Sequence, residues 1–239
     1  MLDLQRRTVA ERARRLIDLT PGRTGNLSVR TGRKIAITPS GVPYDEIEPP
    51  DVPVVSIDGD RLWGRLRPSS ETPMHRHIYD RFETGAIVHV HSPWATTLAT
   101  TGEPLPPVHY MIALAGETVP VAPYATYGTE QLAQNAVEAM SAADSTACLL
   151  ENHGLVATGD DADAALETAV AVESVARVYC QASAIGTPQQ LSAEEIRTVE
   201  AKLAEYGPGD GDTADCNDDT CTGADGEDDN DDRTEPGGI

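Results

Sequence analysis

Short apolar segments that alternate between strand-like and helix-like patterns run along this chain, and they constrain its fold more than any other feature. Apolar runs between Gly and Pro turns predict strands at Leu27–Val29, Lys34–Thr38, Val52–Ile57, Ala86–His91 and Ala147–Glu151. Helical spacing and capping signals predict helices over Leu2–Leu19, Pro73–Phe82, Pro93–Thr100, Thr129–Met140, Asp161–Ile185 and Ser192–Tyr206. The alternation predicts a three-layer α/β or α+β domain in which helices cover a central sheet.

Two histidines, His89 and His91, lie two residues apart in one of the predicted strands. Because residues i and i+2 of a strand point to the same face, they can hold one ion while Val88 and Val90 pack behind them. A third imidazole from His153 would give three nitrogen ligands and an open coordination position, which is typical of a catalytic zinc site. The same pattern fits a half-buried strand whose histidines face solvent, and the pattern alone leaves both interpretations open.

The C-terminal end of the chain is strongly acidic. Of the formal net charge of −21 for 239 residues, −11 falls beyond Gly207, where twelve Asp and Glu residues accompany the single Arg233. A segment this charged and this poor in apolar residues cannot bury enough surface to offset the entropy of ordering. Residues 208–239 are therefore predicted to form a disordered acidic tail. Residues 1–207 are long enough for one domain with a sizeable core.

The net charge of residues 1–207 indicates which partners the protein can bind. This part of the chain is also acidic, and Lys34 and Lys202 are the only lysines in the sequence. Such a surface repels nucleic acid and anionic membranes, so neither is an expected partner. It is similar to the surfaces of proteins from a salt-saturated cytoplasm, where molar salt screens self-repulsion over about 3 Å. We therefore expect a halophilic protein, although an ordinary acidic protein can have the same composition.

The cysteines and the apolar runs indicate a soluble protein. Cys148 and Cys180 fall in a predicted strand and a predicted helix, where they serve as packing residues. Cys216 and Cys221 lie in the acidic tail, and no role is assigned to them. The sequence has no secretory leader and no apolar run near the ~18 residues of a membrane helix, so we expect a cytoplasmic location. It also has no G-x-G-x-x-G or P-loop pattern, so nucleotide binding is not predicted.

Small hydroxyl residues beside glycine recur where predicted strands end. Such residues occur in the segments Gly25–Ser28, Thr38–Gly41 and Pro68–Glu71, and their hydroxyls and backbone N–H groups can converge on an anion. A phosphate would be favourable at the N-terminus of the helix after the third segment. Each segment also fits a plain turn or helix cap. Glu71 itself fits either a first-turn glutamate favoured by the helix dipole or a metal-binding group that moves a proton.

A series of motifs follows one order along the chain: Gly25–Arg30, Ile37–Tyr44, Ser69–Glu71, His89–Ser92, His109–Ala113, Ala122–Thr129 and His153–Leu155. In this order and spacing the chain resembles the class II aldolase/epimerase family over about residues 5–207. The resemblance implies an α/β three-layer (α-β-α) domain with a mostly antiparallel central sheet, of the class II aldolase/adducin-head type. It also implies a homotetramer with fourfold symmetry and sites between subunits. The acidic tail departs from the family pattern.

The resemblance also implies a role for each motif residue. It assigns Zn²⁺ binding to His89, His91 and His153. To Glu71 it assigns metal binding at rest, followed by acid/base work. It assigns binding of the substrate phosphate to the small residues of the loops, Gly25, Asn26, Ser40, Gly41, Ser69 and Ser70. It assigns catalysis to two tyrosines: Tyr110 reaches across a subunit interface to protonate the aldehyde oxygen, and Tyr206 closes over the substrate.

The implied reaction is the cleavage of a ketose 1-phosphate, such as L-fuculose 1-phosphate or a related deoxyketose 1-phosphate, to dihydroxyacetone phosphate and a short aldehyde. Zn²⁺, or another divalent metal, would stabilise the enediolate that forms. No lysine lies near a motif, which counts against a Schiff-base aldolase.

Other members of the family remain alternatives. Methylthioribulose-1-phosphate dehydratases keep a glutamate and three histidines, whereas pentulose-5-phosphate 4-epimerases carry Asp where Glu71 stands. A non-enzymatic alternative is an interaction module like the head domain of adducins. Such modules have lost metal ligands, whereas this chain keeps Glu71 and all three histidines.

Overall fold

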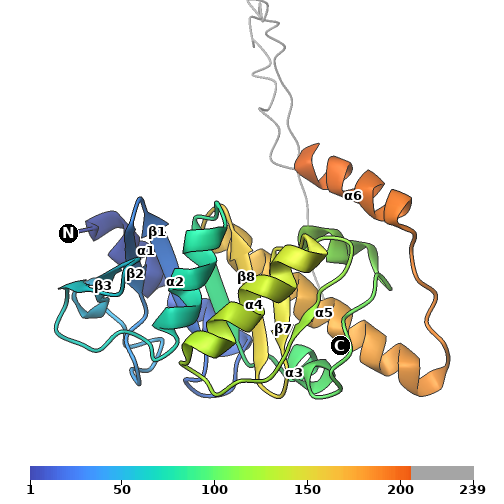
Figure 1. Cartoon of the computed structure of the whole chain (residues 1–239), viewed down its shortest axis with the longest axis horizontal. Helices are drawn as coiled ribbons and strands as arrows, with labels where there is room; N and C mark the ends of the chain where they lie inside the picture. The colour runs from blue at the N-terminus through green and yellow to red at the C-terminus, as the bar shows by residue number, and fades with distance from the viewer. Residues whose placement is uncertain (206–239) are drawn as a thin grey trace, which may run out of the picture. The chain divides into compact units, whose positions relative to one another are not determined.

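A central eight-stranded sheet organises residues 1–205, the part of the chain that this computed structural model describes (Figure 1). Its strands are β1 (Asn26–Thr31), β2 (Lys34–Ile37), β3 (Val54–Ser56), β4 (Arg61–Trp63), β5 (Ala86–Val90), β6 (Val121–Ala122), β7 (Ala147–Leu150) and β8 (Gly154–Gly159). They follow the spatial order β4-β3-β2-β1-β5-β8-β7-β6, and every neighbouring pair is antiparallel except β6–β7. The mostly antiparallel sheet expected from the sequence is confirmed.

Helices cover both faces of this sheet, as expected of a three-layer domain. One face packs against α2 (Thr72–Arg81) and α4 (Glu130–Ala143), which also contact each other. The other face packs against α1 (Asp3–Ala13), α3 (Pro93–Ala99) and α5 (Ala162–Ile185), with α6 (Ala193–Glu205) joined through a short 3-10 helix over Tyr110–Leu114. Figure 1 shows α2 and α4 in front of the sheet and α5 behind it. None of the helices described here is long and apolar enough to cross a membrane.

Strand β5 separates two hydrophobic cores by the alternation of its side chains. Val88 and Val90 are fully buried in the core shared with α1, α3 and α5, and Ile87 is fully buried in the core shared with α2 and α4. Burying a valine side chain contributes about 1.5–3 kcal/mol, so β5 is firmly held between β1 and β8. His89 points to the same face as Ile87 because side chains alternate along a strand. The expectation that the two valines pack behind the histidine face is confirmed.

Two glycines let neighbouring backbone approach the end of β5. A Cβ atom at Gly25 would lie 2.5 Å from the carbonyl oxygen of His89, and one at Gly154 would lie 2.5 Å from the carbonyl oxygen of Val90. No side chain fits at such distances, so a larger residue at either position would push β1 or β8 away from β5. The two glycines therefore keep the loops before β1 and β8 close to His89.

The structure contains elements beyond the predicted ones. Strands β4, β6 and β8 are additional, as are the 3-10 helices over Pro49–Asp51 and Tyr110–Leu114. Strands β4 and β6 are only three and two residues long, which is too short for an alternating pattern to stand out. The helix predicted over Leu2–Leu19 is α-helical only as far as Ala13, and it continues as a 3-10 helix over Arg14–Asp18.

The capping box predicted for the last helix is present. The backbone N–H of Ser192 donates to Glu195 Oε2 at 2.7 Å, and the backbone N–H of Glu195 donates to Ser192 Oγ at 3.3 Å. These two bonds satisfy N–H groups that the first turn of a helix leaves free. Tyr206, which the prediction includes in this helix, and the acidic tail predicted over residues 208–239 lie outside the described residues.

Candidate metal centre

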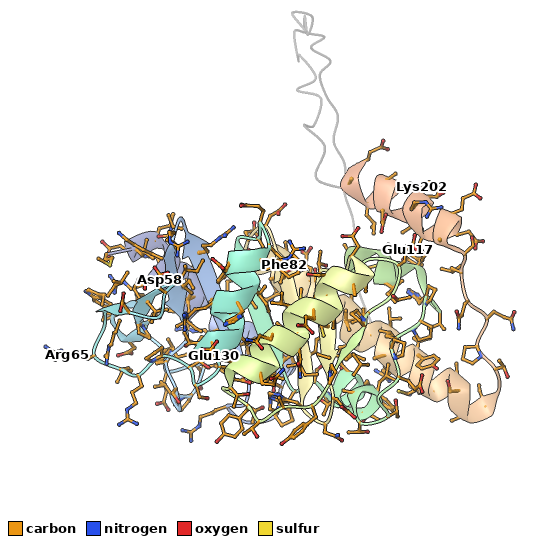
Figure 2. All side chains as sticks on the ribbon, viewed as in Figure 1. Asp58, Arg65, Phe82, Glu117, Glu130 and Lys202 are labelled. Carbon is orange, nitrogen blue, oxygen red and sulfur yellow. The ribbon has the colours of Figure 1, made fainter. Side chains whose placement is uncertain are left out.

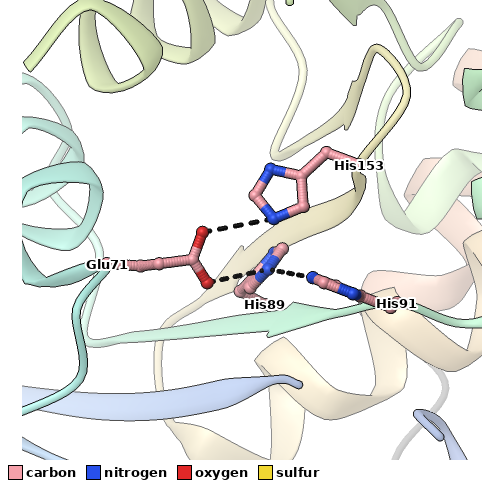
Figure 3. Close-up of side chains that lie close together, drawn as sticks. All are labelled: Glu71, His89, His91 and His153. Carbon is pink, nitrogen blue, oxygen red and sulfur yellow. Dashed lines mark hydrogen bonds and ion pairs between the residues drawn. The ribbon is translucent and has the colours of Figure 1, made fainter. Parts of the chain in front are cut away.

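Four side chains from separate segments meet beside the end of β5 (Figure 3). His89 lies in β5 and His91 just beyond it, His153 lies in the turn between β7 and β8, and Glu71 immediately precedes α2. One ligand atom from each residue lies within 4.8 Å of the ligand atoms of the others. The structure thus brings together all four residues that the sequence analysis placed in a metal site.

The ligand atoms of this cluster converge on a small, enclosed volume. His89 Nε2 lies 3.0 Å from His91 Nε2 and 3.0 Å from Glu71 Oε2. Glu71 Oε1 lies 3.3 Å from His153 Nε2 but makes no hydrogen bond to any of residues 1–205. His89 is fully buried and Glu71 is 4% exposed. Bulk solvent therefore does not reach Glu71 or His89, whereas His91 and His153 are only partly buried.

A hydrogen bond behind His89 determines which of its nitrogens faces the cluster. Nδ1 of His89 donates to the carbonyl oxygen of Leu155 at 2.9 Å, so in the neutral imidazole Nε2 carries a lone pair. That lone pair faces His91 Nε2 and a carboxylate oxygen, so these atoms need a proton or a metal cation between them. Three imidazoles and a carboxylate are also a ligand set that suits Zn²⁺. The residues present therefore fit a divalent metal ion.

The electrostatics favour the protonation states that metal binding requires at Glu71, His91 and His153, but not at His89. Burial raises the pKa of Glu71, but His89, His153 and the Asn26 amide outweigh burial and bring the pKa to about 2. Burial, together with neighbouring imidazoles, lowers the pKa of His91 and of His153 to about 4. Burial lowers the pKa of His89 as well, but the Glu71 carboxylate outweighs it and raises the pKa overall. The Glu71 carboxylate favours a protonated His89 when no metal is bound, and a bound cation would displace that proton.

A row of buried polar groups leads from Glu71 into the protein. Asn26 Nδ2 donates to Glu71 Oε2 at 2.9 Å, and Asn26 Oδ1 lies 2.5 Å from His75 Nε2. Ser28 Oγ lies 2.6 Å from His75 Nδ1 and 2.8 Å from the hydroxyl of Tyr79. The sequence analysis does not single out His75 or Tyr79. The spacing could have indicated them, because Glu71, His75 and Tyr79 lie four residues apart in sequence and therefore on one face of a helix.

A cavity of about 360 Å³ opens beside the metal centre. It is lined by Arg23, Thr24, Ser70, Glu71, His91, Tyr124, Ala125, Tyr127, Asn152 and His153. Tyr124 and Tyr127 are 58% and 65% exposed, so their rings form a part of the cavity wall that faces solvent. The sequence analysis places both tyrosines in a motif but assigns no role to either.

A smaller polar pocket of about 70 Å³ adjoins this cavity and shares Arg23, Thr24, Ser70 and Glu71 with it. The lining includes all six predicted phosphate-binding residues, Gly25, Asn26, Ser40, Gly41, Ser69 and Ser70. Arg23 is the only Lys or Arg among the residues that line either space, and its Nη1 donates to the carbonyl oxygen of Gly41 at 2.7 Å. The sequence analysis missed Arg23, because an arginine in an exposed turn carries no pattern of its own.

Tyr110 does not join the site within one chain. It is 50% exposed, stacks on His109 with 4.6 Å between the ring centroids, and lines neither the cavity nor the polar pocket. Tyr110 therefore does not lie beside the metal centre of its own chain. Tyr206, the other predicted catalytic tyrosine, lies outside the described residues.

Comparisons with known proteins agree with this geometry. The model of the family described as class II aldolase and adducin N-terminal domain matches residues 7–180. The chain is 40% identical over 212 residues to a 5-deoxy-D-ribulose 1-phosphate aldolase from Bacillus thuringiensis, covering 87% of this chain and 99% of that protein. It is 42% identical over 194 residues to a 5-methylthioribulose-1-phosphate/5-deoxyribulose-1-phosphate aldolase from Rhodospirillum rubrum, covering 80% and 86%. A solved structure of an L-fuculose 1-phosphate aldolase matches with a TM-score of 0.80 and 41% identity, covering 84% of this chain and 96% of that one.

Proposed function

The chain belongs to the class II aldolase and adducin N-terminal domain family as a metal-dependent aldolase, and we propose that it cleaves a ketose 1-phosphate to dihydroxyacetone phosphate and a short aldehyde. One observation carries the proposal: the cavity at the metal centre and the small polar pocket share a wall that includes Ser70 and Glu71. A phosphate and a carbonyl that are neighbours in the substrate would then occupy neighbouring spaces in the protein.

The residues that bind substrate have separate tasks in this proposal. When held by His89, His91 and His153, Zn²⁺ or another divalent ion supplies Lewis-acid stabilisation of the negative charge that develops as the C–C bond breaks. The six small residues of the polar pocket bind the phosphate, and this remote binding energy holds the reacting carbons in position. Arg23 adds the positive charge that a phosphate dianion needs on a chain this acidic.

Glu71 moves the proton. Cleavage leaves a carbanion-like carbon that must gain a proton, while the proton of the substrate hydroxyl goes to a second group. The Glu71 carboxylate has one oxygen held by Asn26, while the other has no hydrogen bond to the described residues and faces the cluster. A carboxylate placed in this way can accept a proton at Oε1 and return it without changing its own position.

We infer that the natural substrate is a 5-deoxypentulose 1-phosphate. One observation supports this choice over fuculose 1-phosphate: the relatives at 40% and 42% identity are named for 5-deoxyribulose 1-phosphate. Tyr124, Ala125 and Tyr127 give the cavity a wall with apolar surface, which suits the methyl-ended aldehyde that either substrate would release.

We also propose that the active form is a homotetramer in which Tyr110 of one subunit serves the metal centre of its neighbour. The exposure of Tyr110 and its absence from both spaces support an action outside its own chain. In the family that the motifs resemble, this tyrosine protonates the aldehyde oxygen in the direction of synthesis, so in cleavage it would take the proton from the substrate hydroxyl.

Release of dihydroxyacetone phosphate from 5-deoxyribulose 1-phosphate tests the proposed reaction. The assay uses purified protein in concentrated KCl, with and without EDTA, and L-fuculose 1-phosphate as the comparison substrate. Release that EDTA abolishes and Zn²⁺ restores is the expected result. A folded, metal-loaded protein that releases none from either substrate would contradict it, and a dehydrated or epimerised product would identify one of the alternative reactions. No bound metal together with no turnover would favour an adducin-like interaction module.

A further inference from the structure

The row of buried polar groups behind Glu71 has the arrangement of a positioning device. We propose that His75 orients the Asn26 amide, and that the amide in turn orients the Glu71 carboxylate toward the metal centre. This inference rests on the proposed function for the acid/base role of Glu71. His75 itself does not line the cavity or the polar pocket, so it acts through Asn26 rather than on the substrate.

The row joins two elements that are distant in sequence. Asn26 and Ser28 lie two apart on β1 and face α2, which carries His75 and Tyr79 one turn apart. None of the four is more than 3% exposed. Buried polar groups need hydrogen-bond partners, so the bonds along this row are required and not incidental.

The direction of each bond follows from the chemistry of its members. An ionised Glu71 can only accept, so Asn26 must turn its NH₂ group toward Oε2 and its Oδ1 toward His75. That Oδ1 also only accepts, so the N–H of His75 lies on Nε2. A neutral histidine has a single N–H, which leaves Nδ1 to accept from the hydroxyl of Ser28.

Burial supports this assignment, because it lowers the pKa of His75 to about 3 and keeps the ring neutral. The hydroxyl of Tyr79 completes the row by donating to Ser28, whose Oγ and carbonyl oxygen lie 2.8 and 3.0 Å away. Each bond along the row therefore has one donor and one acceptor, and the Asn26 amide has only one satisfactory orientation.

The consequence for Glu71 is specific. When the Asn26 amide is held in place, it donates an N–H to Glu71 Oε2, and Glu71 Oε1 then faces His153 and the cluster. Without the N–H of His75, Asn26 Oδ1 would be a buried acceptor with no donor, and the amide would shift to find one. Glu71 would then lose the N–H that holds Oε2, and with it its position in the cluster. Removing partners that orient metal-site residues typically costs about 10–100-fold in metal affinity or activity.

Three variants separate positioning from simple core packing. His75→Leu fills the space but removes both hydrogen bonds, whereas His75→Gln can keep an N–H near the position of Nε2. Tyr79→Phe is the matched control, because it removes a buried hydrogen bond of the same row without releasing the Asn26 amide. For each variant, urea unfolding reports the fold, competition with a chelating dye reports Zn²⁺ affinity, and steady-state cleavage separates kcat from KM.

We expect His75→Leu to lower kcat and Zn²⁺ affinity by about 10–100-fold with little change in KM. His75→Gln should recover most of both losses, and Tyr79→Phe should lose stability while keeping kcat and affinity near the original values. A folded His75→Leu protein with unchanged kcat and Zn²⁺ affinity would overturn the proposal. So would a Tyr79→Phe protein that loses as much kcat and affinity as His75→Leu.

The Zn²⁺ measurement also separates this proposal from the proposed function. If the unaltered protein cleaves no ketose 1-phosphate, the aldolase reaction is excluded, but the order of Zn²⁺ affinities among the variants still decides the role of His75. If the unaltered protein cleaves the substrate and all variants bind Zn²⁺ and turn over equally, only the positioning role is lost.

Discussion

Glu71 is the residue on which the proposed chemistry depends, and its environment makes one substitution informative. Glu71→Gln keeps the shape of the side chain and an oxygen that can accept the N–H of Asn26, but it cannot take up a proton. Because His89, His91 and His153 remain, we expect bound metal to persist while kcat falls about 100–10,000-fold, the usual contribution of general acid–base catalysis. Metal content by atomic absorption and cleavage rates measure the two effects.

His91→Ala provides the contrast for that experiment. It removes an imidazole whose Nε2 lies 3.0 Å from that of His89, so we expect both the metal and the turnover to be lost. A Glu71→Gln protein with full kcat would show that the carboxylate does not transfer the proton. A Glu71→Gln protein that loses its metal as completely as His91→Ala would instead show that Glu71 is chiefly a ligand.

A site residue can be predicted from sequence only where the spacing of nearby residues indicates its position. His89 and His91 are predictable from the sequence because two residues two apart on a strand share a face whatever the rest of the chain does. His153 is a candidate third ligand from its residue type alone, and only the resemblance assigns it, since its contact with them joins β5 to the turn after β7. The link from Asn26 to His75 needs the packing of α2 on β1, which no local pattern contains.

At the scale of elements, one carboxylate ties the N-terminal helix to the start of α5. Asp163 accepts from Arg12 Nε and Nη2 at 2.8 and 2.9 Å and from Arg15 Nη1 at 3.0 Å. The hydrogen bond from Arg12 is the main reason that the pKa of Asp163 falls below its ordinary value of 3.8. Because these side chains are partly exposed, we expect Asp163→Asn to lower the free energy of unfolding by only about 0.5–1 kcal/mol.

The dependence of that loss on pH follows from the lowered pKa. A carboxyl group with a lower pKa in the folded state stabilises the fold fully above its unfolded pKa, and the stabilisation disappears as pH falls through the folded pKa. The two proteins should therefore differ in urea unfolding at about pH 7, and the difference should shrink as the pH falls below the ordinary pKa of 3.8. Glu117→Gln, which removes a single exposed pair with Arg197, is the control and should change little. A difference that persists undiminished in acid would exclude the ion pair as its cause.

Elements are predictable where an apolar run lies between turn residues or where a helix end is marked. Apolar runs identify β1, β2 and β5 from sequence, and cap residues identify α4 and α6. The sequence analysis does not predict β8, whose six residues begin and end with glycine. Its place in the sheet comes from pairing with β5 and β7, which is a tertiary property.

At the scale of the whole molecule, sequence predicts the charge of the surface but not which surface meets another subunit. Figure 2 labels Asp58, Glu117 and Glu130 at the surface, where their side chains are 65%, 48% and 58% exposed. Among residues 1–205, Glu71 is the only buried Asp or Glu, as expected when an ionised carboxylate is costly to bury without partners. No comparable rule marks the face around Tyr110, so its partner must be found by experiment.

Mixing two inactive variants tests whether sites form between subunits. If Glu71 acts in its own chain and Tyr110 in the neighbouring one, then Glu71→Gln and Tyr110→Phe proteins should each turn over poorly alone. Refolded together in equal amounts, they should regain about one quarter of the original activity, because random assembly restores both residues at that share of sites. A mixture of Glu71→Gln with His91→Ala should regain none, since both changes fall on groups that one chain contributes to the same cluster. Equal recovery in the two mixtures, or none in either, would place Tyr110 outside the neighbouring site.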